Sequence, residues 1–321
     1  MSKWINDDLF GDFQKQKKIE KEQPRQTTGV RRSELVWETP AKGTETVAKT
    51  YVGRFLPDPK GMFYKEYLYH MYRAGDKWVF VICPKTEGFD EYCPFCSVTS
   101  KLYMGTAADK KMAYTYKRKA KYVGNFFISD DPRDADREPE NKVNGTVKLY
   151  EFPAKVEMKL KEEITDGENG LGKSIFDPGE GGYNFLLKIL ATKRGADGEQ
   201  WPDYSNSSFS RRPEAIGTDA EIEGYMATCQ DVTEYIHSMS KTEDELVKLV
   251  KDEMLFDLIR DEYNQLQQKR NRVAGEADEI PEPVIPPSLS EEHPSDAPDD
   301  FDSPSSNAQD DEDLLRELEN M

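Results

Sequence analysis

Residues 70–96, "HMYRAGDKWVFVICPKTEGFDEYCPFC", hold three of the four cysteines and one of the three histidines. His70, Cys83, Cys93 and Cys96 are separated by 12, 9 and 2 residues. A Cys-x-x-Cys pair places two thiolates on one tight turn, and a preceding hairpin can supply the histidine and the third cysteine. Four protein ligands leave no position for water, so the pattern predicts one structural Zn²⁺ in a Cys3His shell.

A redox pair, a zinc deaminase and coincidence compete with structural zinc as the origin of this cluster. A thioredoxin-like Cys-x-x-Cys needs neither a histidine nor a third cysteine, and it opens a helix after a strand. A zinc deaminase needs His-x-Glu, whereas "MY" follows His70. The remaining Cys229 is expected to be a buried thiol, and His237 and His293 have no ligand-like neighbours. Structural zinc is favoured, with a redox pair and coincidence left open.

Length and composition limit the class of protein. With 321 residues, 33% charged and 36% hydrophobic, the chain can form one large domain or two smaller ones, with some sequence unfolded. It has neither a run of 18 apolar residues nor the apolar centre of a signal peptide at its start. We therefore expect a soluble intracellular protein with no membrane partner, in which clustered cysteines favour metal over disulfides.

The negative charge is concentrated at one end of the chain. The formal net charge is −18, of which residues 276–321 contribute −15 (16 acidic residues and Arg316), leaving −3 for residues 1–275. Residues 101–124 hold seven basic residues and one acidic residue, a local excess of +6. A basic patch and an acidic tail can bind each other or compete for the same partners.

The first half of the chain is typical of a small barrel or sandwich, and the second half is not. Strands are expected within 35–56 (two, around a turn at 40–43), 77–84, 122–130, 145–152 and 183–195. Residues 240–270 open with a capping box, Thr242 and Glu245, and continue with a helical apolar stripe at Val247, Val250, Met254 and Leu258. After residue 275 the sequence is too acidic and proline-rich to bury a core.

Residues 167–174, "GENGLGKS", match the phosphate-binding pattern G-x-x-x-x-G-K-[ST]. That loop works between an apolar strand and a helix. Here a charged segment precedes it, and Pro178 follows closely. We interpret the segment as a loop, and an ATPase that uses Lys173 is the enzymatic alternative.

Aromatic and basic residues alternate in residues 103–127, "YMGTAADKKMAYTYKRKAKYVGNFF", and the mixture recurs in 199–212, "EQWPDYSNSSFSRR". Single-stranded nucleic acid is bound by such mixtures, because cations follow the phosphates while exposed rings stack on bases. A solvated cationic loop with its tyrosines in the core is the plainer interpretation. The candidate contacts are Tyr103, Tyr114, Tyr116, Lys117, Arg118, Lys119, Lys121, Tyr122, Trp201, Tyr204 and Arg211.

The metal cluster, "GRFLP" before it, "YKRKAKYVGNFFISDDP" and "GGYNFLLKI" after it, and the final "DDEDLLRELENM" stand in an order that resembles T-even-type phage single-stranded DNA-binding proteins. The resemblance covers about residues 35–240 and the last dozen. It implies a non-enzymatic, mainly β protein. Its core would be an OB-fold, a small five-stranded barrel, with an inserted Cys3His zinc subdomain, flanking helices and a disordered acidic C-terminal tail.

The resemblance also assigns residues. The metal ligands fall on His70, Cys83, Cys93 and Cys96, the basic run on Lys117–Lys121, and the cleft aromatics on Tyr103, Tyr122, Tyr150, Trp201 and Tyr204. The family's N-terminal motif of basic and hydroxyl residues, used for contact between protomers, is replaced by the looser "KQKKIEKEQPRQTT". Its internal copy has Ala120 and Lys121 where hydroxyl residues are expected.

The expected organisation has four parts. They are an arm for self-association at 1–34, an OB-fold core at 35–239 with the zinc subdomain at about 63–105, an amphipathic helix at 240–273, and a tail at 274–321.

The expected function is sequence-tolerant, cooperative coating of single-stranded DNA during replication, recombination and repair in the cytoplasm of an infected bacterium. The tail would gate the cleft and recruit replication and recombination proteins through Leu314, Leu315 and Leu318. The alternatives are an RNA-binding zinc protein that regulates translation and an interaction hub.

Overall fold

The computed structural model describes residues 4, 32–38, 49–86, 92–166, 168–193 and 200–277. The chain divides into two units, residues 1–267 and 268–321. All but a few residues of the arm expected at 1–34, and nearly all of the tail with Leu314, Leu315 and Leu318, lie outside the described residues. No helix in the described ranges is both long and apolar enough to cross a membrane.

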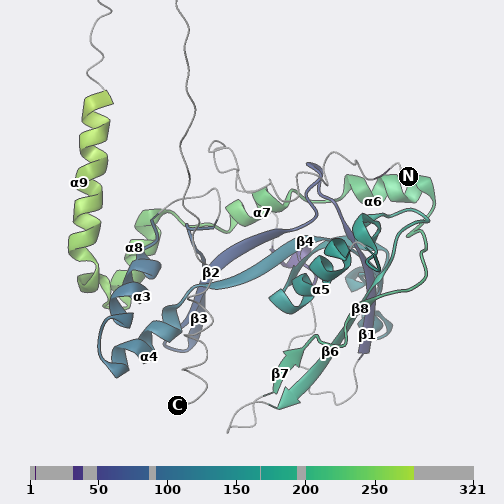
Figure 1. Ribbon diagram of the computed structural model, residues 1–321, viewed down its shortest axis with the longest axis horizontal. Helices are drawn as coiled ribbons and strands as arrows, with labels where there is room; N and C mark the ends of the chain where they lie inside the picture. The colour runs from purple at the N-terminus through teal and green to yellow at the C-terminus, as the bar shows by residue number, and fades with distance from the viewer. Residues whose placement is uncertain are drawn as a thin grey trace, which may run out of the picture. The chain divides into compact units, whose positions relative to one another are not determined.

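The strands of the first unit form one connected antiparallel sheet in the order β3-β2-β4-β1-β6-β7, with β5 paired to β4 and β8 to β6 (Figure 1). The strands are β1 (Lys49–Leu56), β2 (Lys65–Ala74), β3 (Lys77–Ile82), β4 (Lys119–Asp130), β5 (Thr146–Phe152), β6 (Phe185–Lys193), β7 (Gln200–Asp203) and β8 (Ser208–Phe209). The strands predicted at 77–84, 122–130, 145–152 and 183–195 are thereby confirmed. Of the two predicted within 35–56, the second is β1, while the first is a short helix and an isolated bridge at Val36.

The long strand β4 connects the two halves of this sheet. Its first residues, 119–123, pair with β2, and residues 125–130 pair with β1, while β5 lies along its other side. A mainly β core is confirmed. The pairings among the described strands do not close the sheet, so the five-stranded barrel stays a prediction.

Gly53 allows β1 to pass closely over β4. The register shifts between Val52 and Gly53, as in a β-bulge. A Cβ at Gly53 would lie 2.3 Å from the ring of Phe126 and from the carbonyl oxygen of Phe127. Only glycine fits this approach.

The described residues also form α-helices. They are α2 (Arg32–Leu35), α3 (Pro94–Tyr103), α4 (Ala107–Tyr116), α5 (Ala154–Thr165), α6 (Asp219–Ala227), α7 (Val232–Ser238), α8 (Glu243–Asp252) and α9 (Arg260–Ala277). Short 3-10 helices are η1 (Pro132–Ala135), η2 (Pro139–Asn141), η3 (Gly172–Phe176) and η4 (Phe256–Leu258). The predicted capping box of Thr242 and Glu245 is present at the start of α8, and α4 and α6 begin in the same way.

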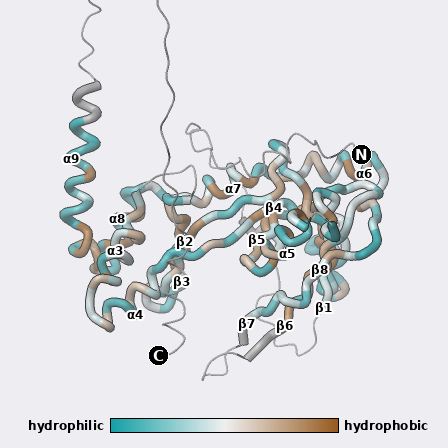
Figure 2. Tube along the Cα trace, viewed as in Figure 1, coloured by the Kyte–Doolittle hydropathy of each residue, from teal (hydrophilic) through white to brown (hydrophobic). Residues whose placement is uncertain are grey.

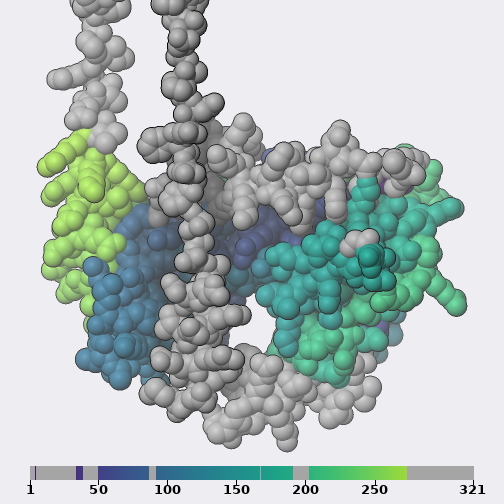
Figure 3. All heavy atoms as spheres, viewed as in Figure 1, coloured from purple at the N-terminus to yellow at the C-terminus, as the bar shows by residue number. Residues whose placement is uncertain are grey.

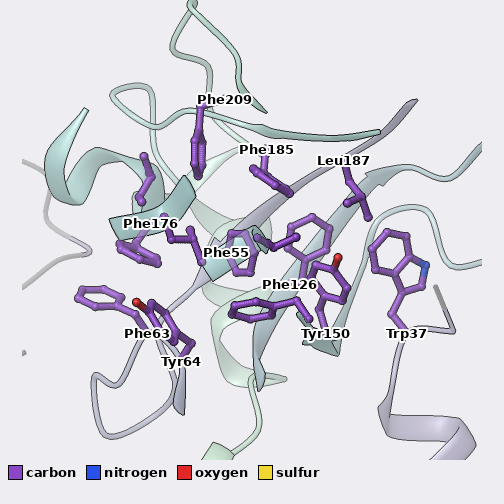
Figure 4. Close-up of a cluster of buried hydrophobic side chains, with 14 of the residues drawn as sticks. Trp37, Phe55, Phe63, Tyr64, Phe126, Tyr150, Phe176, Phe185, Leu187 and Phe209 are labelled. Carbon is purple, nitrogen blue, oxygen red and sulfur yellow. The ribbon is translucent and has the colours of Figure 1, made fainter. Parts of the chain in front are cut away.

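We call the larger core the aromatic lobe, formed by β1, β5, β6, β8, α5, η3 and residues 125–130 of β4. Figure 4 shows its aromatic side chains converging from these elements and from the segments that carry Trp37, Phe63 and Tyr64. Trp37 stacks on Phe126 with ring centroids 5.3 Å apart, and Phe55 meets Phe126 edge to face at 4.9 Å. Each such buried ring contributes about 1.5–3 kcal/mol through burial.

We call the second core the metal lobe, formed by β2, β3, α3, α4, α8 and η4. Its buried side chains include Tyr72, Phe95, Val98, Leu246 and Ile259. The subdomain predicted at about 63–105 is therefore too short, because α4 and residues 246–259 complete its core.

The single helix predicted at 240–273 is divided in two. Met254 adopts a left-handed φ of 58° after α8, while Leu255 N–H bonds to Val250 C=O at 3.0 Å and Met254 N–H to Lys251 C=O at 2.9 Å. This is a Schellman end. It exposes 92% of Met254 and buries Leu255, so the predicted apolar stripe ends at Val250. Helix α9 then starts afresh and is polar over most of its length (Figure 2).

The segment "GENGLGKS" does not have the surroundings of a phosphate-binding loop. Helix α5 precedes it in place of a strand, and η3 follows in place of an α-helix. Lys173 lies within that 3-10 helix.

Candidate metal centre and nucleic-acid interface

Four elements bring the predicted ligands together. His70 lies on β2, and Cys83 directly follows β3. Cys93 is the N-cap of α3, Pro94 begins the helix, and Cys96 lies in its first turn. A redox Cys-x-x-Cys also opens a helix, but a redox pair does not account for the convergence of His70 and Cys83 on the same point.

The ligand atoms of the four residues all lie within 4.8 Å of one another. Cys83 Sγ and Cys96 Sγ are 3.6 Å apart, and His70 Nε2 lies 3.4 Å from Cys93 Sγ and 3.6 Å from Cys96 Sγ. Around a tetrahedral ion with Zn–S bonds of about 2.3 Å, neighbouring sulfurs are separated by roughly 3.8 Å. The donor set and its spacing fit zinc.

The backbone fixes the orientation of the histidine. His70 Nδ1 lies 2.7 Å from the carbonyl oxygen of Tyr116, which can only accept, so Nδ1 carries the proton and Nε2 faces the thiols. Burial lowers the pKa of His70, but hydrogen bonds and charge from Cys83 and Cys96 outweigh it and raise that pKa to about 9. The imidazole is therefore held by the thiols in front of it and by the α4 backbone behind it.

The thiols form one coupled group. Hydrogen bonds from Cys83 and Cys93 hold the pKa of Cys96 far below its usual range, while the same network raises the pKa of Cys93. The network thus favours a thiolate at the half-buried Cys96, next to two buried thiols, where an unpaired charge is costly. A bound divalent cation would relieve that cost.

Tyr122 is the best-placed aromatic residue for stacking. It is half-buried on β4, with Phe152 of β5 stacked on one side at 5.8 Å and 19°, and Tyr64 edge-on at 6.1 Å. Burial, followed by the charges of Glu157 and Glu66, raises the pKa of Tyr122 to about 12, so its hydroxyl stays protonated. Strands β2 and β4 run between α4 on one side and α5 and β6 on the other (Figure 1), and Figure 3 shows the atoms of α4 apart from those of α5 and β6.

Cations lie at the junction of α4 and β4. Lys117 Nζ lies 3.7 Å from the centroid of the exposed Tyr114 ring, a cation–π contact. Arg118 is exposed and Lys119 half-buried. Tyr103, 44% exposed, ends α3 nearby in the same lobe.

Lys121 is already paired. Its Nζ lies 2.7 Å from Glu151 Oε2, and the hydroxyl of Tyr235 on α7 donates to Glu151 Oε1 at 2.7 Å. Glu151 is buried, and Lys121 balances its charge while the Tyr235 hydroxyl bonds to its other oxygen. Lys121 is therefore less available to phosphate than its neighbours.

Two predicted contacts are core residues in this structure. Tyr150 is 1% exposed and packs between Trp37 and Phe126. Tyr116 is 8% exposed, packs on Tyr72, and donates from its hydroxyl to Glu253. Both rings are buried, so neither presents a face to a base in this structure.

The other predicted contacts lie on β7 or follow β7 and β8 in the chain. Tyr204 follows β7 and is half-buried against the aromatic lobe, and Arg211 is exposed after β8. Trp201 lies on β7, and its side chain is outside the described set. Lys155 Nζ, 3.1 Å from Asp203 Oδ1, joins α5 to the end of β7.

Sequence reasoning missed Phe152, Glu66 and the exposed Trp78. Phe152 and Glu66 are the cross-strand partners of Tyr122 on β5 and β2. Their roles depend on register, which strand alternation alone does not provide. Trp78, 66% exposed near the tip of the β2–β3 hairpin, is an aromatic signal that was visible in the sequence.

The comparison with family models agrees with this arrangement. The model described as gp32 DNA-binding protein-like matches residues 49–251, which include the whole metal centre and the residues from Tyr103 to Arg211. The search of curated proteins gave no match. Because the family model covers more than half of the sequence, the resemblance seen in the sequence is confirmed: the chain belongs to the gp32-like family of DNA-binding proteins.

Proposed function

We propose that the protein coats single-stranded DNA, with little regard to sequence, across β2 and β4 between the metal lobe and the aromatic lobe. The observation that carries this proposal is Tyr122, a half-buried ring that Phe152 supports from behind, with Arg118 and Lys119 at the adjacent end of β4. Base–aromatic stacking suits any base, since every base has a π-face.

The proposed contact residues have different roles. Arg118 and Lys119 supply charge to phosphates, and Lys117 does so while resting on Tyr114. Tyr122 supplies stacking. Lys121 contributes less, because moving it to a phosphate leaves the buried Glu151 without its cation.

A bound metal would stabilise the elements that carry this surface. A zinc ion held by His70, Cys83, Cys93 and Cys96 would neutralise the thiolates and tie β2 and β3 to the start of α3. The carbonyl oxygen of Tyr116, which holds His70, lies directly before Lys117 in the chain. The metal centre therefore positions the first cation of the interface through the backbone.

The wider role follows from family membership and charge. We propose that the protein acts in phage DNA replication, recombination and repair inside the infected bacterium. Protomers would bind cooperatively through residues 1–34. The tail, with −15 on residues 276–321, would compete with DNA for the cations at low salt and recruit replication proteins.

The test is a fluorescence titration with oligo(dT) over a salt series. Tyr122→Ala is expected to weaken binding by about 1–3 kcal/mol with an unchanged salt slope. Arg118→Ala should reduce that slope by roughly 0.7, the value for one phosphate on a single strand. The exposed Lys248→Ala on α8 is the matched charge control and should change neither quantity.

Two outcomes count against the proposal. If Tyr122→Ala and Arg118→Ala lost the same affinity and changed the salt slope equally, the proposed difference in their roles would be wrong. Tighter binding to oligo(U) than to oligo(dT) would favour the RNA-binding alternative.

A further inference from the structure

An acidic side chain lies beside the proposed stacking ring. Glu66 on β2 and Tyr122 on β4 are direct cross-strand partners, and the Tyr122 hydroxyl donates to Glu66 Oε1 at 3.4 Å. Glu66 is exposed, and the bond from Tyr122 occupies one of the roughly four acceptor positions of its carboxylate. Among the described residues no other side chain bonds to this carboxylate, so its remaining positions are available to a ligand.

Strand order decides which side of the Tyr122 ring is free. Strands β5 and β2 flank β4 on opposite sides, and Phe152 of β5 stacks against the ring. The other side of the ring is therefore the side toward β2 and Glu66. A base that stacks there brings an edge within reach of the carboxylate, since directly opposed residues have Cβ atoms about 4.5–5.5 Å apart.

The charges around the ring determine which part of the strand comes near it. Glu157 on α5, which accepts from the Tyr64 hydroxyl at 3.4 Å, is a second carboxylate near the Tyr122 hydroxyl. Lys161 balances Glu157 at 2.7 Å, which leaves Glu66 as the exposed anion. Phosphates are repelled from this point and attracted to Lys117 and Arg118, so the strand faces Glu66 with a base edge.

We propose that Glu66 reads the Watson–Crick edge of the base that stacks on Tyr122 and that it favours guanine at this one position. The inference rests on the proposed function and adds a local base preference to otherwise sequence-tolerant binding. An ionised carboxylate only accepts hydrogen bonds. It therefore selects for donors on the base edge.

Guanine fits best because its N1–H and N2–H₂ groups are adjacent donors that match the two carboxylate oxygens. Cytosine and adenine each offer one exocyclic amino group, with acceptors beside it. Thymine offers only N3–H between two carbonyl oxygens, which face the carboxylate unfavourably. Edges of unpaired bases are available for such contacts, in contrast to those in a duplex.

The test compares guanine with inosine, a purine that differs only in lacking the 2-amino group. Two oligo(dT) strands carry isolated dG or dI at the same positions, are too sparse in guanine to form quadruplexes, and are short enough to bind one chain each. The full-length protein, Glu66→Gln and the exposed Glu140→Gln are titrated with both strands and with plain oligo(dT).

The wild type and Glu140→Gln should bind the dG strand roughly five-fold or more tighter than the dI strand, the lower end of what a bidentate contact supplies. In Glu66→Gln that ratio should fall to near one, while affinity for plain oligo(dT) is kept or increased. Equal wild-type affinity for dG and dI strands, with oligo(dT) still bound, would overturn the inference alone. Failure to bind any strand would overturn the proposed function as well.

Discussion

The metal lobe and the aromatic lobe are joined through β4, which pairs with β2 of the metal lobe and contributes residues 125–130 to the aromatic lobe, but they are stabilised in different ways. Of the described residues, the aromatic lobe buries sixteen in its core, eleven of them aromatic. The metal lobe buries thirteen, of which three are aromatic and two, Cys83 and Cys93, are predicted metal ligands. The aromatic lobe thus has the apolar area to fold by burial, whereas we expect the metal lobe to depend on a metal bound by the four predicted ligands.

The C-terminal helices contact the rest of the chain next to the predicted metal ligands. Glu262 of α9 accepts from Ser97 at 2.7 Å, directly after the ligand Cys96. Glu253, after α8, accepts from Tyr116, whose carbonyl holds His70. Both contacts are made to the shell around the metal. The helices after residue 243 should therefore lose protection together with the metal lobe when the metal is removed.

Removing the metal should have the largest effect and should separate the two lobes. Binding of structural zinc supplies apparent free energies of about 10–16 kcal/mol, which the small core of the metal lobe does not replace. Cys96→Ser, or chelation of the wild type, should raise hydrogen exchange in β3, α3 and α8, while β1 and β5 stay protected. Metal analysis should find one zinc per wild-type chain.

Cys229→Ser is the control, since Cys229 packs with Leu56 and Phe127, away from the metal ligands. It should keep both zinc and protection. Equal loss of protection in both lobes on chelation would show that they fold as one unit, and would remove the energetic contrast between them.

Acid should act on the aromatic lobe through Asp131. This buried carboxylate accepts from Trp37 Nε1 at 3.1 Å and pairs with Arg133 Nη2 at 2.6 Å. Burial raises its pKa, but the bonds from Arg133 and Trp37 prevail, and the pKa ends below the ordinary value of 3.8. The stabilisation is therefore fully present above pH 3.8 and is lost as pH falls through the lower folded value.

Asp131→Asn should lower the free energy of unfolding by about 1–3 kcal/mol at pH 7, and the difference from wild type should shrink below pH 3.8. Because acid also releases thiolate-bound metal, the readout is hydrogen exchange in β1 and β5 alone. The exposed Asp136→Asn is the matched control. If the difference in protection between Asp131→Asn and the wild type increased as the pH fell, the pKa of Asp131 would not be lowered by folding.

The metal site and the strands were predictable from the sequence, because ligand spacing and β-branched runs are local signals. His70, Cys83, Cys93 and Cys96 do converge, and β3 to β6 lie where expected. The end of α8 was not predictable from periodicity, because Met254 takes a conformation that glycine usually supplies. Likewise, nothing local distinguishes the buried Tyr150 from the half-exposed Tyr122, since register and lobe position decide between them.

The smallest expected effect tests the link between the metal shell and the C-terminal helices. The Tyr116 hydroxyl donates to Glu253 Oε2 at 2.9 Å, while its ring packs on Tyr72 and Phe95. Tyr116→Phe removes only the hydroxyl, so the bond from His70 to the backbone and the zinc content should be unchanged. Because Glu253 is only half-buried, the loss should be about 1 kcal/mol, seen as faster hydrogen exchange in α8. Glu253→Gln keeps an acceptor and should recover part of the protection. If Tyr116→Phe lost zinc, the Tyr116 hydroxyl would be needed for metal binding. Its bond to Glu253 would then not be an independent contact between the metal lobe and α8.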